Sequence, residues 1–364
     1  MRSRNWLALA AAGALAIGVA ACGSSSKSGG STGSGASISG AGATFPQPVY
    51  DEWANRFKSK DGIAVNYNPI GSGGGIAQFT AGTVDFGASD SAMKPEEVKA
   101  AEKKGTPVHV PTVFGAITVA YNVSGLQKGL KLDGATVADL FLGKIKKWND
   151  PVIAKLNPGV KLPSTSVTVV HRSDESGTTK LFTSFLAEES PAWSKQVGSD
   201  KTVKWPTGTG AAKNAGVAGG VKQTDGAVGY VEQAYALQNN FTVADVKNKA
   251  GQFVEPSLAS TTAAGEGLTI PADLRFSAIN ASSNPKAYPI ASATFLLVYQ
   301  DMCKAGLTKA KAQDVVKWLN YAEGPGQQVA PSLSYAALPA ALSAKAKAKV
   351  AGLKCNGAPL TAGA

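Results

Sequence analysis

Short apolar runs alternate with amphipathic segments through nearly the whole chain after residue 37, and this alternation restricts the fold more than any other feature. Such alternation is typical of an α/β protein. Strands are expected at 64–70, 84–88, 108–113, 116–121, 167–170, 227–231 and 294–299. One helix is expected after Thr44, because apolar residues recur there every four positions. Further helices are expected at 76–81, 95–104, 137–142, 179–188, 309–321 and 340–353.

The first 36 residues have the composition of an export signal and a tether. Arg2 and Arg4 precede an apolar run that ends at Cys22, a pattern typical of a secretory signal peptide over 1–21 and too short for a comfortable transmembrane span. Residues 19–22, Val-Ala-Ala-Cys, resemble a bacterial lipobox, which implies cleavage before Cys22 and a lipid anchor, with acyl chains such as palmitate, on its sulfur. The alternative is an ordinary signal peptide that contains a cysteine. The rest of 22–36 is almost wholly Gly, Ser, Thr and Ala, which predicts a flexible linker.

The chain has three cysteines, and assigning Cys22 to the lipid leaves Cys303 and Cys355 as a pair. Outside the cytoplasm an even pair favours a disulfide. We therefore expect a Cys303–Cys355 bond, with two free buried thiols as the alternative.

The formal net charge of +11 is spread over scattered lysines, and only Arg56, Arg172 and Arg275 remain as arginines once the signal is removed. Basic residues are not interleaved with aromatic ones, which disfavours nucleic-acid binding. Only two histidines are present, too few for a histidine-rich metal site. We expect neither a metal nor a cofactor, and a monomer.

Three glycine- and serine-rich segments precede expected helices, at 40–45, 71–75 and 176–178. Unpaired backbone N–H groups and the helix dipole make such positions favourable for anions, although each segment alone is also an ordinary cap or turn. None matches a Walker motif, and no Gly-x-Gly-x-x-Gly unit follows a strand, so nucleotide binding lacks its usual support.

Two charged residues at expected strand ends point to phosphate more sharply. Arg172 follows the strand at 167–170, and a guanidinium can donate two parallel N–H bonds to a phosphate. The alternative is a surface arginine paired with Asp174. Asp90 ends the strand at 84–88, where it caps the next helix or accepts the proton that hydrogen phosphate carries and sulfate lacks.

Six segments, taken together, resemble the substrate-binding subunits of bacterial phosphate-specific transport systems. The resemblance spans about residues 38 to 353, in order and at similar spacing, and is carried by residues 39–46, 65–67, 70–74, 84–90, 142–148 and 172–178. It implies a two-lobed periplasmic-binding-protein-like fold of type II with the ligand in the interdomain cleft. It also implies that the protein binds inorganic phosphate at the outer face of the membrane and delivers it to the permease subunits of an ABC importer. The first lobe is expected at 37–112 plus 290–364, and the second at 113–289.

The resemblance also implies a set of phosphate-binding positions: Thr44, Phe45, Ser72, Asp90, Arg172, Ser176, Gly177 and Thr178. Asp174 would hold Arg172 in place. Glu175 departs from the family pattern, where a small residue is expected, and we expect its carboxylate to point to solvent.

Other classes of function would require features that differ from these. A phosphatase or other serine hydrolase would need a base beside its nucleophile; His171 lies near Ser176 in sequence, but 174–178 lacks the first glycine of a Gly-x-Ser-x-Gly elbow. A receptor for sulfate or molybdate is a nearer alternative, and Asp90 is the feature that separates it from a phosphate receptor. A surface adhesin or structural lipoprotein would show no saturable anion binding.

Overall fold

The computed structural model describes residues 36–361, which belong to a unit that spans Gly35–Ala364. The expected signal peptide, the expected lipidation site Cys22 and nearly all of the expected linker lie outside the described residues. Within 36–361, none of the helices combines the length and the apolar character that a membrane crossing requires.

One mixed sheet forms the frame of the fold, in the order β2-β1-β3-β12-β4-β8-β6-β7, with β9 beside β4. Strands β1, β2 and β3 are parallel to one another, as are β6, β7 and β8, while β12 and β4 run antiparallel between the two groups. Its strands are β1 Ser37–Gly42, β2 Ala64–Pro69, β3 Phe86–Ser89, β4 Pro107–Asn122, β6 Thr168–Arg172, β7 Thr209–Ala211, β8 Ala227–Glu232, β9 Thr242–Val243 and β12 Ala291–Tyr299.

Two smaller sheets and the helices complete the described part of the chain. The small strands are β5 Lys131–Leu132, β10 Asp245–Lys247, β11 Phe253–Val254, β13 Lys354–Cys355 and β14 Ala358–Pro359. The helices are α1 Gln47–Asp61, α2 Ser72–Ala81, α3 Pro95–Ala101, α4 Gly134–Phe141, α5 Pro151–Leu156, α6 Gly177–Glu189, α7 Pro191–Gln196, α8 Lys213–Gln223, α9 Gln233–Gln238, α10 Leu258–Ala264, α11 Lys309–Glu323, α12 Pro325–Val329, η1 Ala330–Leu333 and α13 Ala340–Ala351.

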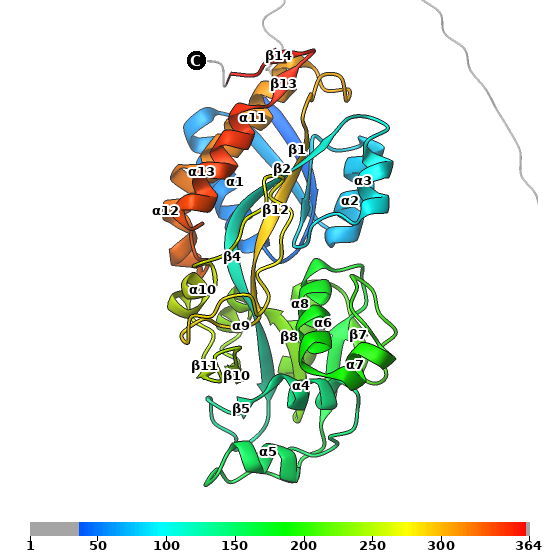
Figure 1. Cartoon of the computed structure of the whole chain (residues 1–364), viewed down its shortest axis with the longest axis vertical. Coiled ribbons are helices and arrows are strands. Elements are labelled where there is room, and N and C mark those ends of the chain that lie inside the picture. The colour runs from blue at the N-terminus through cyan, green and yellow to red at the C-terminus, as the bar shows by residue number, and fades with distance from the viewer. Residues whose placement is uncertain (1–35, 362–364) are drawn as a thin grey trace, which may run out of the picture. The chain divides into compact units, whose positions relative to one another are not determined.

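Strand β4 links the two halves of the sheet. Its residues 107–116 pair with β12, and its residues 117–122 pair with β8. We call β1, β2, β3, β12 and the first part of β4, with their helices, the first lobe; the second lobe contains β6, β7, β8 and the rest of β4 (Figure 1). The expected two-lobed α/β architecture is confirmed. The residue boundaries expected for the lobes stay a prediction.

Three glycine-rich places differ from the sequence-based expectation, and close packing is the reason in the first two. Residues 37–42 form strand β1 instead of a turn; a Cβ on Gly40 would lie 2.1 Å from the Phe86 ring. The two strands expected around Gly115 are one strand, β4, because that glycine makes room for Phe45 and not for a bend. Helix α2 begins at Ser72 and not near residue 76.

Aromatic side chains fill the first lobe beneath α1. Val49, Trp53 and Phe57 are buried as their four-residue spacing predicts. Trp318 of α11 packs edge-on against both Trp53 and Phe57, at ring-centroid distances of 6.2 and 5.5 Å. Such edge-to-face pairs contribute to stability beyond the area that they bury. Helices α1 and α11, which lie far apart in the sequence, therefore share one core.

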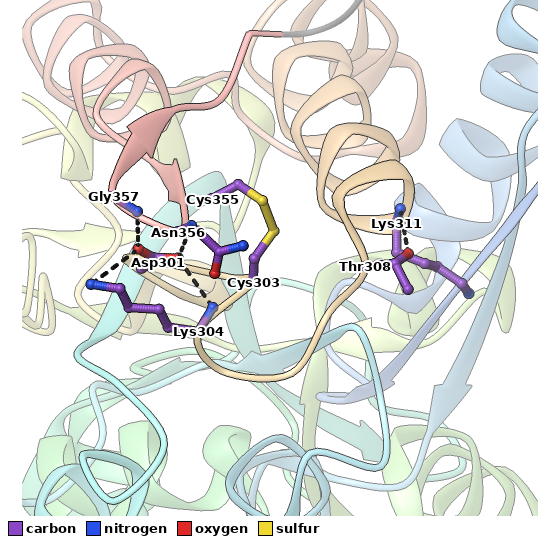
Figure 2. Close-up of a disulfide and its surroundings, with 8 residues drawn as sticks. All are labelled: Asp301, Cys303, Lys304, Thr308, Lys311, Cys355, Asn356 and Gly357. Carbon is purple, nitrogen blue, oxygen red and sulfur yellow. Dashed lines mark hydrogen bonds and ion pairs between the residues drawn. A yellow bond between two sulfur atoms is a disulfide. The ribbon is translucent and has the colours of Figure 1, made fainter.

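The expected disulfide between Cys303 and Cys355 is present, with 4.7 Å between its Cα atoms. Figure 2 shows that it lies beside Asp301, whose carboxylate accepts hydrogen bonds from the backbone N–H groups of Asn356 and Gly357. The bond and these contacts tie the short β13–β14 hairpin to the segment that follows β12. The free-thiol alternative is excluded.

Candidate functional site

Polar side chains of the first lobe gather where its three parallel strands end. Thr44 and Phe45 follow β1, Ser72 follows β2 and Asp90 follows β3. Because parallel strands end at the same sheet edge, these residues come together although 46 positions of sequence separate the first from the last. The Asp90 backbone N–H donates to Ser72 Oγ over 3.2 Å, and all four residues are buried.

The second lobe presents a matching group at the end of β6. Arg172 is the last residue of that strand, and Ser176, Gly177 and Thr178 form the N-terminus of α6. Ser176 Oγ accepts the Thr179 backbone N–H over 3.1 Å, so the capping interpretation of this serine is correct. Its own O–H hydrogen is still available to a further acceptor, since a hydroxyl both donates and accepts.

The two groups face each other across the boundary between the lobes. Thr178 Oγ1 lies 3.3 Å from Asp90 Oδ2. A Cβ on Gly177 would lie 2.3 Å from Ser72 Oγ and 2.8 Å from Asp90 Cβ, so only glycine allows this approach. The structure therefore brings all eight sequence-predicted positions to one place. That these residues bind phosphate stays a prediction.

Arg172 is not a surface residue, because it is only 3% exposed. Asp174 holds the guanidinium from one side: Nε donates to Oδ1 over 2.7 Å, and Nη2 donates to Oδ2. Among the described residues, Nη1 has no hydrogen-bond partner although it is buried. A buried, unpaired guanidinium nitrogen is costly unless it binds an anion.

Asp90 does not cap the following helix, because the N-cap of α3 is Lys94. Its carboxylate accepts from Thr294 Oγ1 over 2.9 Å. Burial raises the pKa of Asp90 to about 7, and the opposing effects of the Thr294 hydrogen bond and the Arg172 charge offset this only in part. The side chain is thus a buried acid whose proton is labile near neutral pH.

Sequence reasoning missed four residues beside this group: Asn214, Glu232, Thr294 and Tyr335. Asn214 Nδ2 lies 2.9 Å from Thr44 Oγ1, and Tyr335 OH lies within hydrogen-bond distance of both the Phe45 carbonyl, at 2.7 Å, and Glu232 Oε2, at 2.8 Å. Asn214 is the second residue of α8, three positions after the end of the three-residue strand β7, which is too short and too glycine-rich for an apolar pattern to reveal. The strand-end rule that found Arg172 would have found Asn214 had β7 been recognised.

Other contacts between the lobes surround the group. Glu175 is an exposed residue, but its carboxylate lies against Gly73, where a Cβ would be 2.2 Å from Oε2. The Glu175 carbonyl accepts the Gly73 backbone N–H over 3.0 Å. Lys201, whose side chain is 1% exposed, forms an ion pair with Glu97 of α3. Lys94 forms a second ion pair with Asp200, at 2.6 Å. The lobes are therefore held together beside the polar group as well as through it.

The hydrolase interpretation receives no support from the position of His171. Its Nδ1 lies 3.0 Å from the Arg172 carbonyl, and its ring stacks on Trp205 with 4.7 Å between centroids. Within residues 36–361, His171 and Ser176 share no hydrogen bond, and no three His, Cys, Asp or Glu side chains are grouped as a metal site would require.

Comparison with known proteins gives the family. The family model of the PBP superfamily domain matches residues 27–322. The chain is 42% identical over 313 residues to the phosphate-binding protein PstS of Pasteurella multocida, covering 85% of this chain and 89% of that protein. It is 36% identical over 291 residues to the phosphate-binding protein PstS 3 of Mycobacterium leprae, covering 76% and 78% of the two chains.

Solved structures agree on the fold. The phosphate-bound, high-affinity periplasmic phosphate-binding protein PfluDING superposes with a TM-score of 0.69 at 23% identity, covering 86% of this chain and 93% of that one. A phosphate-binding protein from Stenotrophomonas maltophilia gives a TM-score of 0.65 at 22% identity, with the same coverage. At these identities the superpositions show a shared architecture and nothing about function. Together with the extent and identity of the sequence matches, they place this chain in the PBP superfamily and, within it, in the PstS family of phosphate-binding proteins.

Proposed function

We propose that this protein binds inorganic phosphate outside the cytoplasmic membrane and delivers it to an ABC importer. The carrying observation is that two helix N-termini, buried hydroxyls and one unpaired guanidinium nitrogen converge on a single buried aspartate. The names of the PstS relatives support phosphate as the ligand. The proposed ligand-binding residues are Thr44, Phe45, Ser72, Asp90, Arg172, Ser176, Gly177 and Thr178.

Each group would have a distinct task. The hydroxyls and the backbone N–H groups of Phe45 and Gly177 would donate to phosphate oxygens, in positions that the helix dipoles also favour. Arg172 would add Nη1 and the remaining hydrogen of Nη2, while Asp174 fixes the plane of the guanidinium. Asp90 would accept the proton of hydrogen phosphate. Sulfate, which has no proton to give, would leave the carboxylate unpaired and repelled.

Closure of the two lobes would bury the anion, and the closed form would be recognised by the permease. Lipid attachment at Cys22 would keep the protein at the outer face of the membrane, since each buried acyl methylene contributes about 0.8 kcal/mol. Incorporation of labelled palmitate into the wild-type protein, lost in Cys22→Ser, tests this anchor. Incorporation that persists in the variant contradicts it.

Calorimetric titration of the purified protein with phosphate, and then with sulfate, tests the ligand. Phosphate should bind in a saturable way and sulfate should not. Arg172→Ala should weaken phosphate binding at least about 100-fold, because it removes charge-assisted bonds from a buried site. Arg56→Ala is the matched control, since Arg56 is exposed on α1 and pairs only with Glu52.

Three results would contradict this proposal. Tight sulfate binding would indicate a receptor for another oxyanion, and no saturable anion binding would indicate a structural lipoprotein. Release of a chromophore from p-nitrophenyl phosphate, abolished in Ser176→Ala, would indicate a phosphatase instead of a receptor.

A further inference from the structure

Asn214 lies between the two lobes and touches a threonine from each. It is fully buried and is the second residue of α8, which follows β7. Its side-chain Oδ1 accepts the Glu232 backbone N–H over 3.0 Å. A backbone N–H can only donate, so the atom that faces it must be the oxygen and the amide orientation is fixed. The side-chain NH₂ group therefore points at Thr44 Oγ1 and Thr178 Oγ1, at 2.9 and 3.3 Å.

This orientation decides what the two hydroxyls can do. A threonine hydroxyl has one hydrogen to donate and two lone pairs to accept with. Thr44 Oγ1 receives both Asn214 Nδ2 and the Asn214 backbone N–H, the latter over 3.3 Å, so its capacity to accept is used up. Its hydrogen is left to donate elsewhere. Thr178 Oγ1 accepts from Asn214 Nδ2 with one of its two lone pairs and donates its hydrogen to Asp90 Oδ2, so Asn214 orients this hydroxyl without using up its capacity to accept.

The chain holds Asn214 in place through an unusual backbone conformation. Lys213, directly before it, has a φ of 65°, in the left-handed region that non-glycine residues adopt only at a cost. Its backbone N–H donates to Asp174 Oδ1 over 2.9 Å. Asp174 also holds the Arg172 guanidinium, so one carboxylate positions both the arginine and the start of α8.

We propose that Asn214 is a positioning residue that forces the Thr44 hydroxyl to donate toward the bound anion and orients the Thr178 hydroxyl beside it. This inference rests on the proposed function and deepens it. Without Asn214, each hydroxyl could turn a lone pair toward the ligand, which an anion tolerates poorly. The residue also links the lobes, since Thr44 belongs to the first and Thr178 to the second.

Substitution by leucine tests the proposal, with phosphate affinity measured by calorimetry and folding checked by thermal unfolding without phosphate. Asn214→Leu should weaken phosphate binding about 10- to 100-fold, roughly tenfold for each hydroxyl that is no longer directed. Asn157→Leu is the matched control. Asn157 is also a buried amide that joins two backbone segments, bonding Lys131 of β5 through both Oδ1 and Nδ2, but it lies at the C-terminal end of α5 and not at the site. The Asn157→Leu substitution should lower the unfolding temperature and leave the phosphate affinity unchanged.

A double-mutant cycle separates positioning from general loosening of the fold. Thr44→Val should weaken binding about tenfold in the wild type but less than about threefold in the Asn214→Leu background, because there the hydroxyl is already undirected. Equal losses in the two backgrounds would overturn the proposal, as would an Asn214→Leu variant with wild-type affinity.

A second variant covers the case in which Asn214→Leu does not fold. Asn214→Asp keeps an oxygen for the Glu232 N–H but accepts from both threonines when ionised, so at pH 8 phosphate binding should fall more than 100-fold. Affinity within threefold of the wild type would overturn the proposal. A wild-type protein that binds no phosphate refutes the proposed function itself, whereas wild-type binding with an unaffected Asn214 variant refutes only this inference.

Discussion

Replacing Asp90 by asparagine should change which anion the protein accepts more than how tightly it holds phosphate. The carboxylate is 1% exposed, so a bound tetrahedral anion would meet it without intervening solvent. Hydrogen phosphate would supply a proton to this acceptor, while sulfate would leave two negative groups in contact. Rejection of a ligand that lacks the required hydrogen reaches about 10⁴-fold in sites of this kind.

The magnitudes for Asp90→Asn follow from the bonds that remain. The amide oxygen can still accept from Thr294 and from the phosphate proton, but as a neutral acceptor, so about 1 kcal/mol is lost and phosphate affinity falls about five- to tenfold. The amide NH₂ can now donate to sulfate, and the repulsion is gone. Sulfate affinity should therefore rise at least 100-fold, and the preference for phosphate should nearly vanish.

Calorimetric titration of both anions at pH 8 measures these changes, with thermal unfolding as the check on folding. The pH dependence provides a second test. Since the pKa of Asp90 is raised to about 7 by burial, the wild-type carboxyl is protonated below that pH and can donate to sulfate. Wild-type sulfate affinity should thus increase as the pH falls from 8 to 6, and that of the variant should not. An asparagine variant that still excludes sulfate as strongly as the wild type would refute the reasoning.

Three further substitutions address packing and stability. Gly177→Ala should weaken phosphate binding about 10- to 100-fold, because its Cβ would push Ser72 and Asp90 away. The control Gly219→Ala, with open space around its Cβ, should leave binding unchanged. Calorimetry measures both, and equal phosphate affinities of the two variants would contradict the close approach at Gly177. Glu323→Gln should remove a pH dependence of unfolding. Burial raises the pKa of Glu323 to about 9 and its two carboxylate oxygens have no partner among the described residues, so the native state holds its proton between about pH 4.5 and 9 and stability declines as pH rises through this window. Relative to the variant, the wild type should lose roughly 4 kcal/mol of unfolding free energy between pH 5 and 8, and parallel denaturation profiles would contradict this. Replacing Cys303 and Cys355 by serine should cost about 4 kcal/mol by the chain-entropy estimate for a 52-residue separation, measured by denaturant unfolding; an unchanged midpoint would show that the hairpin contacts suffice.

The sequence by itself determined the α/β class, the disulfide partners and the group of candidate residues at the sheet edge. Thr44, Ser72 and Asp90 follow strands that are parallel to one another, and the ends of parallel strands share an edge whatever the details of packing. Arg172 ends β6, which runs opposite to those strands, so the sequence indicated a strand end there but not that it would meet the other three. The positions carried over from the family resemblance also came together, because they lie on those same strand ends and on the N-terminus of α6.

Tertiary structure alone decided the features that depend on close packing between distant segments. The role of Gly115 as space for Phe45, and not as a turn, depends on a ring 70 positions away in the sequence. The raised pKa of Asp90 comes from its burial among segments that are distant in the sequence, which include Thr294 of β12 and Thr178 of α6. Asn214 carries no local signal, because β7 is short and its contacts to Thr44 and Thr178 exist only once both lobes are folded. Periodicity reports which face of an element is buried, but not which atoms from other elements will lie against it.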